Sequence, residues 1–221
     1  GQVFESPTEL INRCSVDGLL VLVSADQIFT VVKQLLPAQL PLFIEKPPGL
    51  APEQTKILTE LADKHKTQTM VGYNRRFYSV FQKGLDLIHQ YGSLRGVSVE
   101  GHERFWKITD RPLSHEIREN WIYANSTHTI DLLRLFGGEV VSVHSVHKNV
   151  QEKKGDQFIA SMEFDSGVLG SYTSHWYSPG GWSVKLYGDG VTVEFKPLEQ
   201  AIWIDTEFNE NEINPDELDV K

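Results

Sequence analysis

The feature that most constrains the fold is a β-α-β-α-β pattern between residues 16 and 73. Three short apolar runs are typical of strands covered on both faces: Val16–Val23, Leu42–Ile44 and Thr69–Tyr73. The segments between them, Asp26–Leu36 and Ala51–Lys66, carry apolar residues at helical spacing. Because strands that alternate with helices pair in parallel through right-handed crossovers, the pattern predicts half of a doubly wound α/β sheet.

The pattern changes after a further helix predicted at Phe77–Tyr91. Alternating segments then predict the strands Val97–Val99, Val140–Val146, Phe158–Phe164, Val168–Ser174, Ser183–Tyr187, Val191–Phe195 and Ala201–Ile204. One helix, at about Ile122–Phe136, interrupts them, and the acidic tail Asn209–Lys221 is expected to be loop or frayed. We therefore predict a first domain at residues 1–91 and an α+β domain with a large, mostly antiparallel open-faced sheet at residues 92–221.

Composition narrows the class of partner. The 221 residues carry a formal net charge of −9, so the chain lacks the basic surface that nucleic acid binding requires. No segment approaches the roughly 20 apolar residues of a membrane-spanning helix.

The single cysteine, Cys14, fits a reducing, cytoplasmic compartment. His144 and His147 fall on opposite faces of one strand, and we expect no metal site.

The segment FIEKPPG, Phe43–Gly49, places a Glu-Lys pair at the carboxyl end of a predicted parallel strand. Ligands bind at that edge of open α/β sheets. A lysine held there can exchange a proton with a carbinol or carbonyl as hydride moves, and Glu45 can orient it. The alternative is that Lys46 is a solvated lysine in a turn. The proline pair favours a fixed geometry and admits a cis bond.

Two further segments carry candidate chemistry. In NSTHTIDLLRLFGG, Asn125–Gly138, His128 can act as an acid-base group, or it can be a hydrogen-bonded structural histidine. Asp131 fits a structural carboxylate better than a catalyst. The aromatic cluster Ser174–Trp182 can form a sugar-binding wall, but ordinary sheet packing and a turn are the favoured explanation, because aromatic residues favour strands.

With these motifs in view, the sequence resembles the glucose-fructose oxidoreductase and inositol dehydrogenase family, the Gfo/Idh/MocA type. The resemblance rests on VDGLLVLV (16–23), EKPPG (45–49), VGYNRRF (71–77) and STHTIDLLRLFGG (126–138), in the family's order. It implies that residues 1–91 are the C-terminal part of a nicotinamide-dinucleotide-binding Rossmann domain. Residues 92–221 would then be a substrate-binding domain that forms homo-oligomers through its open sheet.

The resemblance also implies residue roles. Lys46 and His128 would be catalytic, and Glu45, Lys46 and Pro47 would lie by the nicotinamide of NAD or NADP. Ser24 is assigned to the cofactor, at a strand end where the family commonly has Thr-Pro. Four residues of these segments and of the aromatic cluster are predicted to bind a sugar or polyol substrate: Asn74, Arg75, Asn125 and His175.

Three departures limit the resemblance, and the replacement of the strand-end Thr-Pro around Val23 and Ser24 is one of them. The chain holds no G-x-G-x-x-G turn, so we expect it to be incomplete, with about 60 residues of βαβ structure ahead of Gly1, and to bind cofactor poorly by itself. We also expect its C-terminal end to be incomplete. Members with a catalytic Asp place it four residues before the histidine, where this chain has Ala124.

Three hypotheses follow. The first is an NAD(P)-dependent oxidoreductase of a sugar, sugar derivative or polyol, with Lys46 as the acid-base group. The second is a non-catalytic relative that senses a nucleotide or sugar, which Ala124 would permit. The third is a binding or assembly module held together by its exposed sheet.

Overall fold

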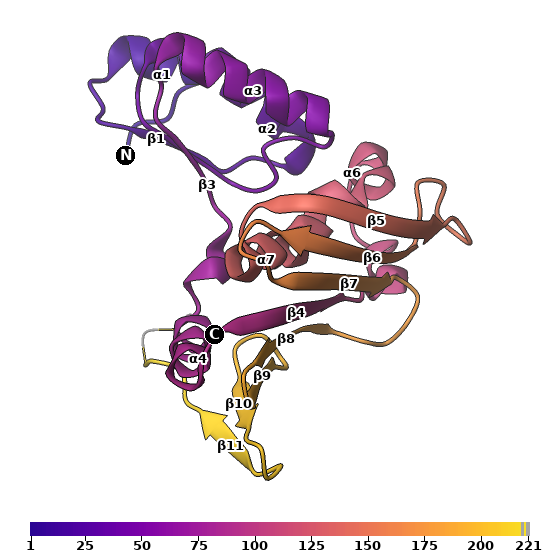
Figure 1. The fold of residues 1–221 in the computed structure, drawn as a ribbon. Coiled ribbons are helices and arrows are strands. Elements are labelled where there is room, and N and C mark those ends of the chain that lie inside the picture. The colour runs from indigo at the N-terminus through magenta and orange to yellow at the C-terminus, as the bar shows by residue number, and fades with distance from the viewer. Residues whose placement is uncertain (218, 220–221) are drawn as a thin grey trace. The chain divides into compact units, whose positions relative to one another are not determined.

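The computed structural model describes residues 1–217 and 219, which form two compact units (Figure 1). The first unit comprises residues 1–73 and 112–127, and the second comprises residues 74–111 and those from 128 onward. The chain therefore crosses between the units at 73–74, 111–112 and 127–128.

The first unit is built on three parallel strands, β1 (Leu19–Val21), β2 (Leu42–Ile44) and β3 (Thr69–Val71), in the order β1-β2-β3. This confirms the predicted parallel pattern. Its helices are α1 (Pro7–Arg13), α2 (Ala25–Leu35), the 3₁₀ turn η1 (Leu36–Ala38), α3 (Pro52–His65), α6 (His115–Glu119) and the π-helical segment η3 (Ile122–Ser126). The apolar stripe of α2, with Ile28 and Val32, packs against Leu42 and Ile44 to form the core.

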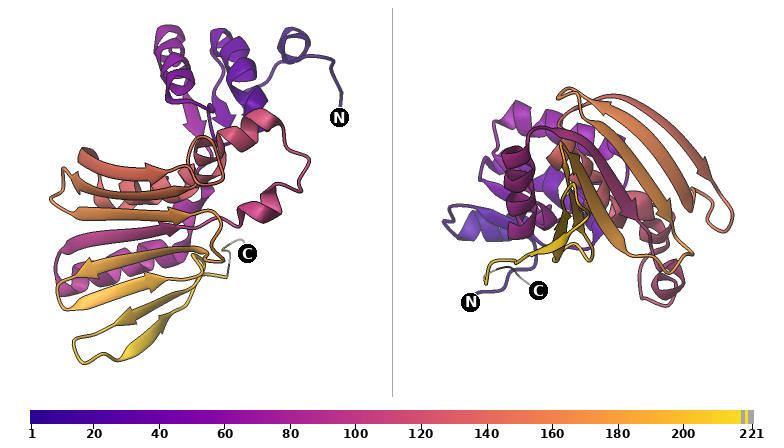
Figure 2. Two further views of the ribbon diagram at one scale, coloured as in Figure 1. Left: turned by 90° about the vertical axis from the view of Figure 1, so that its right-hand side faces the viewer. Right: turned by 60° about the horizontal axis from the view of Figure 1, so that its bottom comes forward.

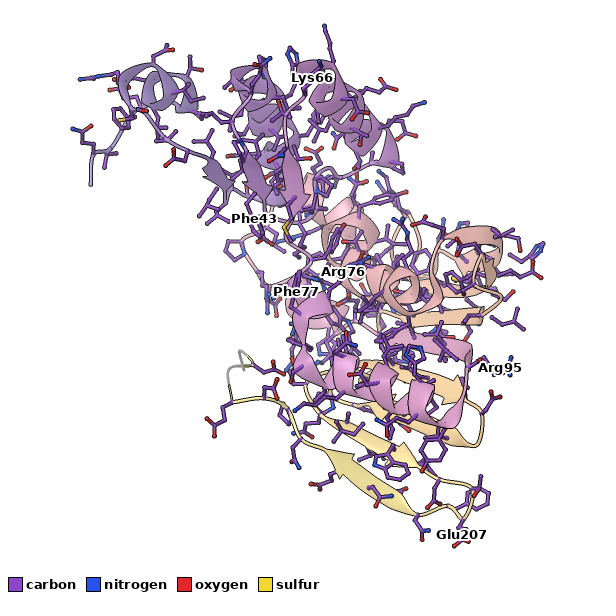
Figure 3. All side chains as sticks on the ribbon, turned by 60° about the vertical axis from the view of Figure 1, so that its left-hand side comes forward. Phe43, Lys66, Arg76, Phe77, Arg95 and Glu207 are labelled. Atoms are coloured by element: carbon purple, nitrogen blue, oxygen red, sulfur yellow. The ribbon has the colours of Figure 1, made fainter. Side chains whose placement is uncertain are left out.

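One face of this small sheet carries exposed apolar side chains, contrary to the expectation of strands covered on both faces. The row that the register aligns across the three strands consists of Leu20, Phe43 and Met70. Their side chains are 72%, 36% and 49% exposed. In Figure 3, Phe43 is labelled on this unit, as is Lys66, which ends α3 in a left-handed conformation.

The second unit is an eight-stranded sheet in the order β11-β10-β9-β8-β4-β7-β6-β5. Its strands are β4 (Leu94–Gly101), β5 (Val140–Lys148), β6 (Gln157–Phe164), β7 (Leu169–His175), β8 (Trp182–Gly188), β9 (Val191–Phe195), β10 (Ala201–Ile204) and β11 (Glu210–Ile213). Every pairing is antiparallel except β4 with β7. The predicted mostly antiparallel sheet is confirmed.

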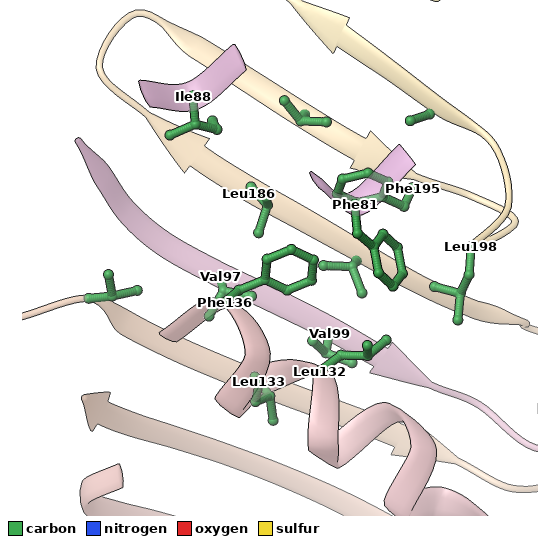
Figure 4. Close-up of a cluster of buried hydrophobic side chains, with 14 of the residues drawn as sticks. Phe81, Ile88, Val97, Val99, Leu132, Leu133, Phe136, Leu186, Phe195 and Leu198 are labelled. Carbon is green, nitrogen blue, oxygen red and sulfur yellow. The ribbon is translucent and has the colours of Figure 1, made fainter. Parts of the chain in front are cut away.

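Helices α4 (Ser79–Tyr91) and α7 (Thr127–Gly137) cover one face of this sheet (Figures 1 and 2). Phe81 of α4 makes edge contacts with Phe136 of α7 and Phe195 of β9, at ring-centroid distances of 5.3 and 4.8 Å (Figure 4). The alternate strand residues, such as Val97 and Val99, point into the same core. The other face of the sheet is left open by the helices.

Two sequence expectations differ from the structure. The helix expected in the first domain, α4, belongs to the second unit, because its Val80, Phe81 and Ile88 pack on the large sheet. The tail expected to be loop contains β11, which pairs with β10 although it is polar. Residues 218, 220 and 221, which were also expected to be loop or frayed, lie outside the described residues. The short helices η2 (Asn74–Phe77) and α5 (Phe105–Ile108) complete this unit.

Candidate active site

The carboxyl ends of the three parallel strands carry the candidate residues of the first unit. Ser24 follows β1, and Glu45 and Lys46 follow the central strand β2 directly. Glu45 is tied into the sheet edge, since its N–H donates to the Val21 carbonyl at 2.9 Å. Pro47 is buried and its peptide bond with Lys46 is cis, as the sequence admitted. The Glu-Lys-Pro segment therefore lies at the edge where open α/β sheets bind ligands.

Lys46 is half-buried, and its Nζ donates a hydrogen bond of 3.1 Å to the carbonyl oxygen of Ala124. Ala124 lies in the π-helical segment η3, with 5% of its surface exposed. A π-helical turn shifts the regular pattern of backbone hydrogen bonding, and such turns recur at functional sites. The solvated-lysine alternative therefore does not describe Lys46, whose ammonium has a defined partner.

Ser24 is exposed, and its hydroxyl forms a hydrogen bond with a neighbouring side chain. Its Oγ donates to Oδ1 of Asp26 at 2.6 Å, in the first turn of α2. The hydroxyls of Ser24 and then Ser114 lower the pKa of Asp26, because hydrogen bonds to the carboxylate favour its charged form. The N-terminus of α2 thus presents a carboxylate, which disfavours an anionic group of a ligand at this position.

In the second unit, Arg75 is the centre of a contact cluster. Its Nη1 donates to Oε1 of Glu199 at 2.8 Å, and Tyr78 Oη donates to the same oxygen at 2.9 Å. The guanidinium lies 5.2 Å from the ring centroid of Tyr78 and 5.7 Å from that of Trp182. His128, which is 8% exposed in the first turn of α7, lies 5.8 Å from the same Trp182 ring. Arg75 and His128 thus share one aromatic neighbour.

Next to this cluster, Arg76 and Asp131 form a two-point ion pair. Nε and Nη2 of Arg76 donate to the two carboxylate oxygens of Asp131 at 2.5 and 2.6 Å. The pair ties η2 to α7 and supports the structural interpretation of Asp131. Figure 3 labels Arg76 on this unit.

His175 lies away from His128. Along β7 the alternate residues Tyr172 and Ser174 are buried on the helix-covered face, so His175 belongs to the open face. There its ring stacks on His102 at 5.6 Å, and its N–H donates to His102 Nδ1 at 3.1 Å. The structure does not bring these two candidate site residues together.

The remaining candidates are Asn74, exposed at the start of η2, and Asn125, half-buried in η3. Sequence reasoning missed Glu199 and Tyr78, because Glu199 lies 124 residues from Arg75 and no local signal links them. Within the described residues, no group of three or more His, Cys, Asp or Glu side chains is placed to hold a metal ion. The described helices also include none that is long and apolar enough to cross a membrane.

Two family models match the chain. Residues 1–73 match a model of an oxidoreductase family with an NAD-binding Rossmann fold, and residues 91–194 match a Gfo/Idh/MocA C-terminal domain. The chain belongs to the Gfo/Idh/MocA family of oxidoreductases. The resemblance drawn from the EKPPG and VGYNRRF motifs is thereby confirmed.

Curated members of the Gfo/Idh/MocA family match at low identity. The chain is 24% identical to scyllo-inositol 2-dehydrogenase (NAD⁺) of Bacillus subtilis over 211 residues, which cover 91% of this chain and 59% of the relative. It is 28% identical to the rhizopine catabolism protein MocA of Rhizobium meliloti over 76 residues, or 34% of this chain and 24% of that protein. The chain thus spans only part of the length of these relatives.

Solved structures of oxidoreductases share the fold. An NAD-binding oxidoreductase from Klebsiella pneumoniae superposes with a TM-score of 0.80 at 15% identity, covering 96% of this chain and 64% of that one. The UDP-N-acetylglucosamine 3-dehydrogenase of Acidithiobacillus ferrooxidans gives 0.77 at 19% identity, covering 99% and 69%. At these identities the likeness concerns the fold.

The Gfo/Idh/MocA assignment makes a nicotinamide dinucleotide the cofactor of this Rossmann family. The residues present fit one end of such a cofactor. Lys46 and Glu45 at the carboxyl end of the central strand provide polar groups at the edge where nicotinamide chemistry takes place in doubly wound sheets. The printed sequence contains no G-x-G-x-x-G turn, so the chain itself supplies no glycine-rich cradle for the pyrophosphate.

Proposed function

We propose that the protein is an NAD(P)-dependent oxidoreductase that moves a hydride between nicotinamide and a carbinol carbon of a sugar, sugar derivative or polyol. The observation that carries the proposal is the hydrogen bond between Lys46 Nζ and the Ala124 carbonyl, at the carboxyl end of β2. It holds an amine in a half-buried position at the edge of the sheet, where it can exchange a proton with a substrate hydroxyl.

In substrate oxidation, the O–H proton of the carbinol passes to the neutral amine of Lys46 and leaves an ammonium there. Bound nicotinamide supplies the hydride acceptor. The Ala124 carbonyl accepts a hydrogen bond from either state of the nitrogen, so it keeps Lys46 oriented before and after proton transfer. His128 assists by binding the reacting hydroxyl. Arg75, Asn74 and Asn125 remain proposed substrate contacts, and Ser24, Glu45 and Pro47 remain proposed cofactor contacts. His175 is left out of the proposed substrate contacts, because it lies on the open face away from His128.

Turnover tests this proposal directly. The protein is assayed with NADH and NADPH, or their oxidised forms, against a panel of sugars and polyols, beside Lys46→Ala. We expect kcat to fall by about 100-fold or more, because the acid-base group is removed. Lys56→Ala is the matched control, since Lys56 is an exposed lysine of α3 in the same unit. Equal activity of the two variants would remove Lys46 from the mechanism.

A second candidate function is a sensor that binds a nucleotide or sugar without turnover. The buried methyl group of Ala124, at the position where catalytic family members carry Asp, favours it. Cofactor binding in a titration, together with no turnover on any substrate of the panel, would select this function.

The same proposal includes a cytoplasmic location and self-association through the open sheet face. Leu169, Ile159 and Val146 lie on that face, at 61%, 56% and 69% exposure. Light scattering of Leu169→Asp should show dissociation relative to the unchanged protein. An unchanged mass would exclude this surface.

A further inference from the structure

The charge of Arg75 is compensated by the carboxylate of Glu199, which belongs to the same unit. Glu199 Oε1 accepts hydrogen bonds from both Arg75 and Tyr78. The guanidinium is also bounded by the Tyr78 and Trp182 rings. An ion pair and two aromatic rings thus fix the orientation of the Arg75 fork.

The neighbouring cation is compensated in the same manner. Arg76 has both oxygens of Asp131 as partners. Each of the two guanidinium groups of η2 therefore has a carboxylate partner. Arg75 Nε is buried without a hydrogen-bond partner among the described residues, whereas the side chain as a whole is 29% exposed, so the Nη groups are the donors toward a ligand.

A neutral hydroxyl and an anionic group of a ligand interact differently with the Arg75–Glu199 ion pair. A hydroxyl oxygen accepts an N–H bond and leaves the Arg75–Glu199 pair in place. A carboxylate approaching Arg75 is repelled by Glu199 or must displace it, because two like charges compete for one guanidinium. The pair therefore discriminates by charge.

We infer that Glu199 is a specificity-determining residue that makes the Arg75 site select uncharged, hydroxyl-bearing ligands over the corresponding sugar acids. The inference rests on the proposed function as a sugar or polyol oxidoreductase, and it narrows the substrate class to neutral sugars and polyols at the group that contacts Arg75.

The test uses D-glucose and D-glucuronate, which differ only in the oxidation state and charge at one carbon. Calorimetric titration of the protein measures the dissociation constant of each, with and without cofactor, and turnover is recorded in parallel. Four forms are compared: the unchanged protein, Glu199→Gln, Glu194→Gln, and Glu199→Gln combined with Arg75→Gln. Glu194 pairs with Lys185 at 2.8 Å on the opposite face of the same sheet, so its variant makes the same change of charge away from Arg75.

The unchanged protein should bind glucose more tightly than glucuronate. Glu199→Gln should improve glucuronate binding relative to glucose by about tenfold, because it frees a guanidinium for a charge-assisted hydrogen bond. Glu194→Gln should leave the ratio unchanged, and the double variant should lose the gain. Preference of the unchanged protein for glucuronate, an identical ratio in the two single Gln variants, or no binding of either sugar would overturn the inference.

The two proposals can fail separately. The expected binding ratios without turnover would uphold charge selection by Glu199 and refute the oxidoreductase function. Turnover of neutral sugars with an unaltered ratio in Glu199→Gln would uphold the function and refute the role of Glu199.

Discussion

Lys46 and Ala124 are joined by a hydrogen bond of 3.1 Å between an ammonium and a backbone carbonyl 78 positions later in the chain. The resemblance to the family implies an Asp at this position in members that use a catalytic Asp, and this chain has Ala124 there. The carbonyl dipole orients the amine without the full charge that would hold it protonated. The activity of Lys46 should therefore respond strongly to a carboxylate introduced at position 124.

Ala124→Asp should move the rising pH limb of kcat/KM for substrate oxidation upward by about one to three units. The new negative charge stabilises the ammonium of Lys46, and oxidation needs the neutral amine. The measurement is a pH–rate profile. Ala124→Asn is the matched control, because it adds nearly the same volume at this buried position without the charge. Coincident limbs for the two variants would contradict the assignment of Lys46 as the base.

Asp131→Asn should lower the free energy of unfolding by about 1–3 kcal/mol, because it removes a two-point charge-assisted pair and leaves Arg76 without its carboxylate. Urea denaturation of this variant, of Arg76→Gln and of the double variant gives the coupling free energy. Additive losses would show that the pair contributes nothing, and a loss of kcat without loss of stability would make Asp131 catalytic.

His102 should make the protein less stable as the pH falls below about 6.5. Burial lowers the pKa of His102, the charges of His175 and Lys196 lower it further, and Glu100 opposes them. Since the folded state then binds fewer protons than the unfolded state, stability is complete above the unfolded pKa and is lost as the pH drops toward the folded one. Protonation also ends the acceptance of the His175 N–H by Nδ1. In His102→Gln, the free energy of unfolding measured with urea should depend less on pH between 7.5 and 5.5. An unchanged pH dependence would show that another group causes the effect.

Gly84→Ala should destabilise the protein, although alanine is ordinarily the better helix residue. A Cβ at Gly84 would lie 2.6 Å from Cζ of the fully buried Phe195. The overpacking cost of about 1–3 kcal/mol exceeds the helix gain of about 1 kcal/mol. Thermal unfolding of Gln82→Gly and Gln82→Ala, at an exposed position of the same helix, provides the reference. A higher Tm for Gly84→Ala would show that the α4–β9 contact relaxes.

The sequence patterns predicted the elements whose burial follows a simple period. Leu42–Ile44, Val191–Phe195 and Ala201–Ile204 agree with the structure residue for residue, because each strand alternates or runs continuously through a core. β11 was missed, because Glu210–Ile213 is stabilised by pairing with β10 rather than by an apolar pattern. The helix α1 was also missed, although Ser6 and Glu9 supply a local capping signal.

The position of Lys46 in the fold was predictable, because its motif directly follows an apolar strand. The partners of Lys46 and Arg75 were not, because the Ala124 carbonyl and Glu199 come from distant segments that only the tertiary fold brings together. The π-helical segment that carries Ala124 has no periodic signature that separates it from an α-helix. Sequence reasoning thus placed Lys46 at a strand end and missed the groups that contact it.

The interleaving of the two units constrains how the chain emerges from the ribosome. The first unit needs residues 112–127, so β4, at Leu94–Gly101, is synthesised before that unit is complete. The strands that pair with β4 are β7 and β8, which begin at Leu169 and Trp182 and are synthesised later. At about 5–20 residues per second, this strand keeps unpaired edges for several seconds during translation, a window in which chaperones can bind. Neither unit can be transplanted into another protein as one uninterrupted gene segment.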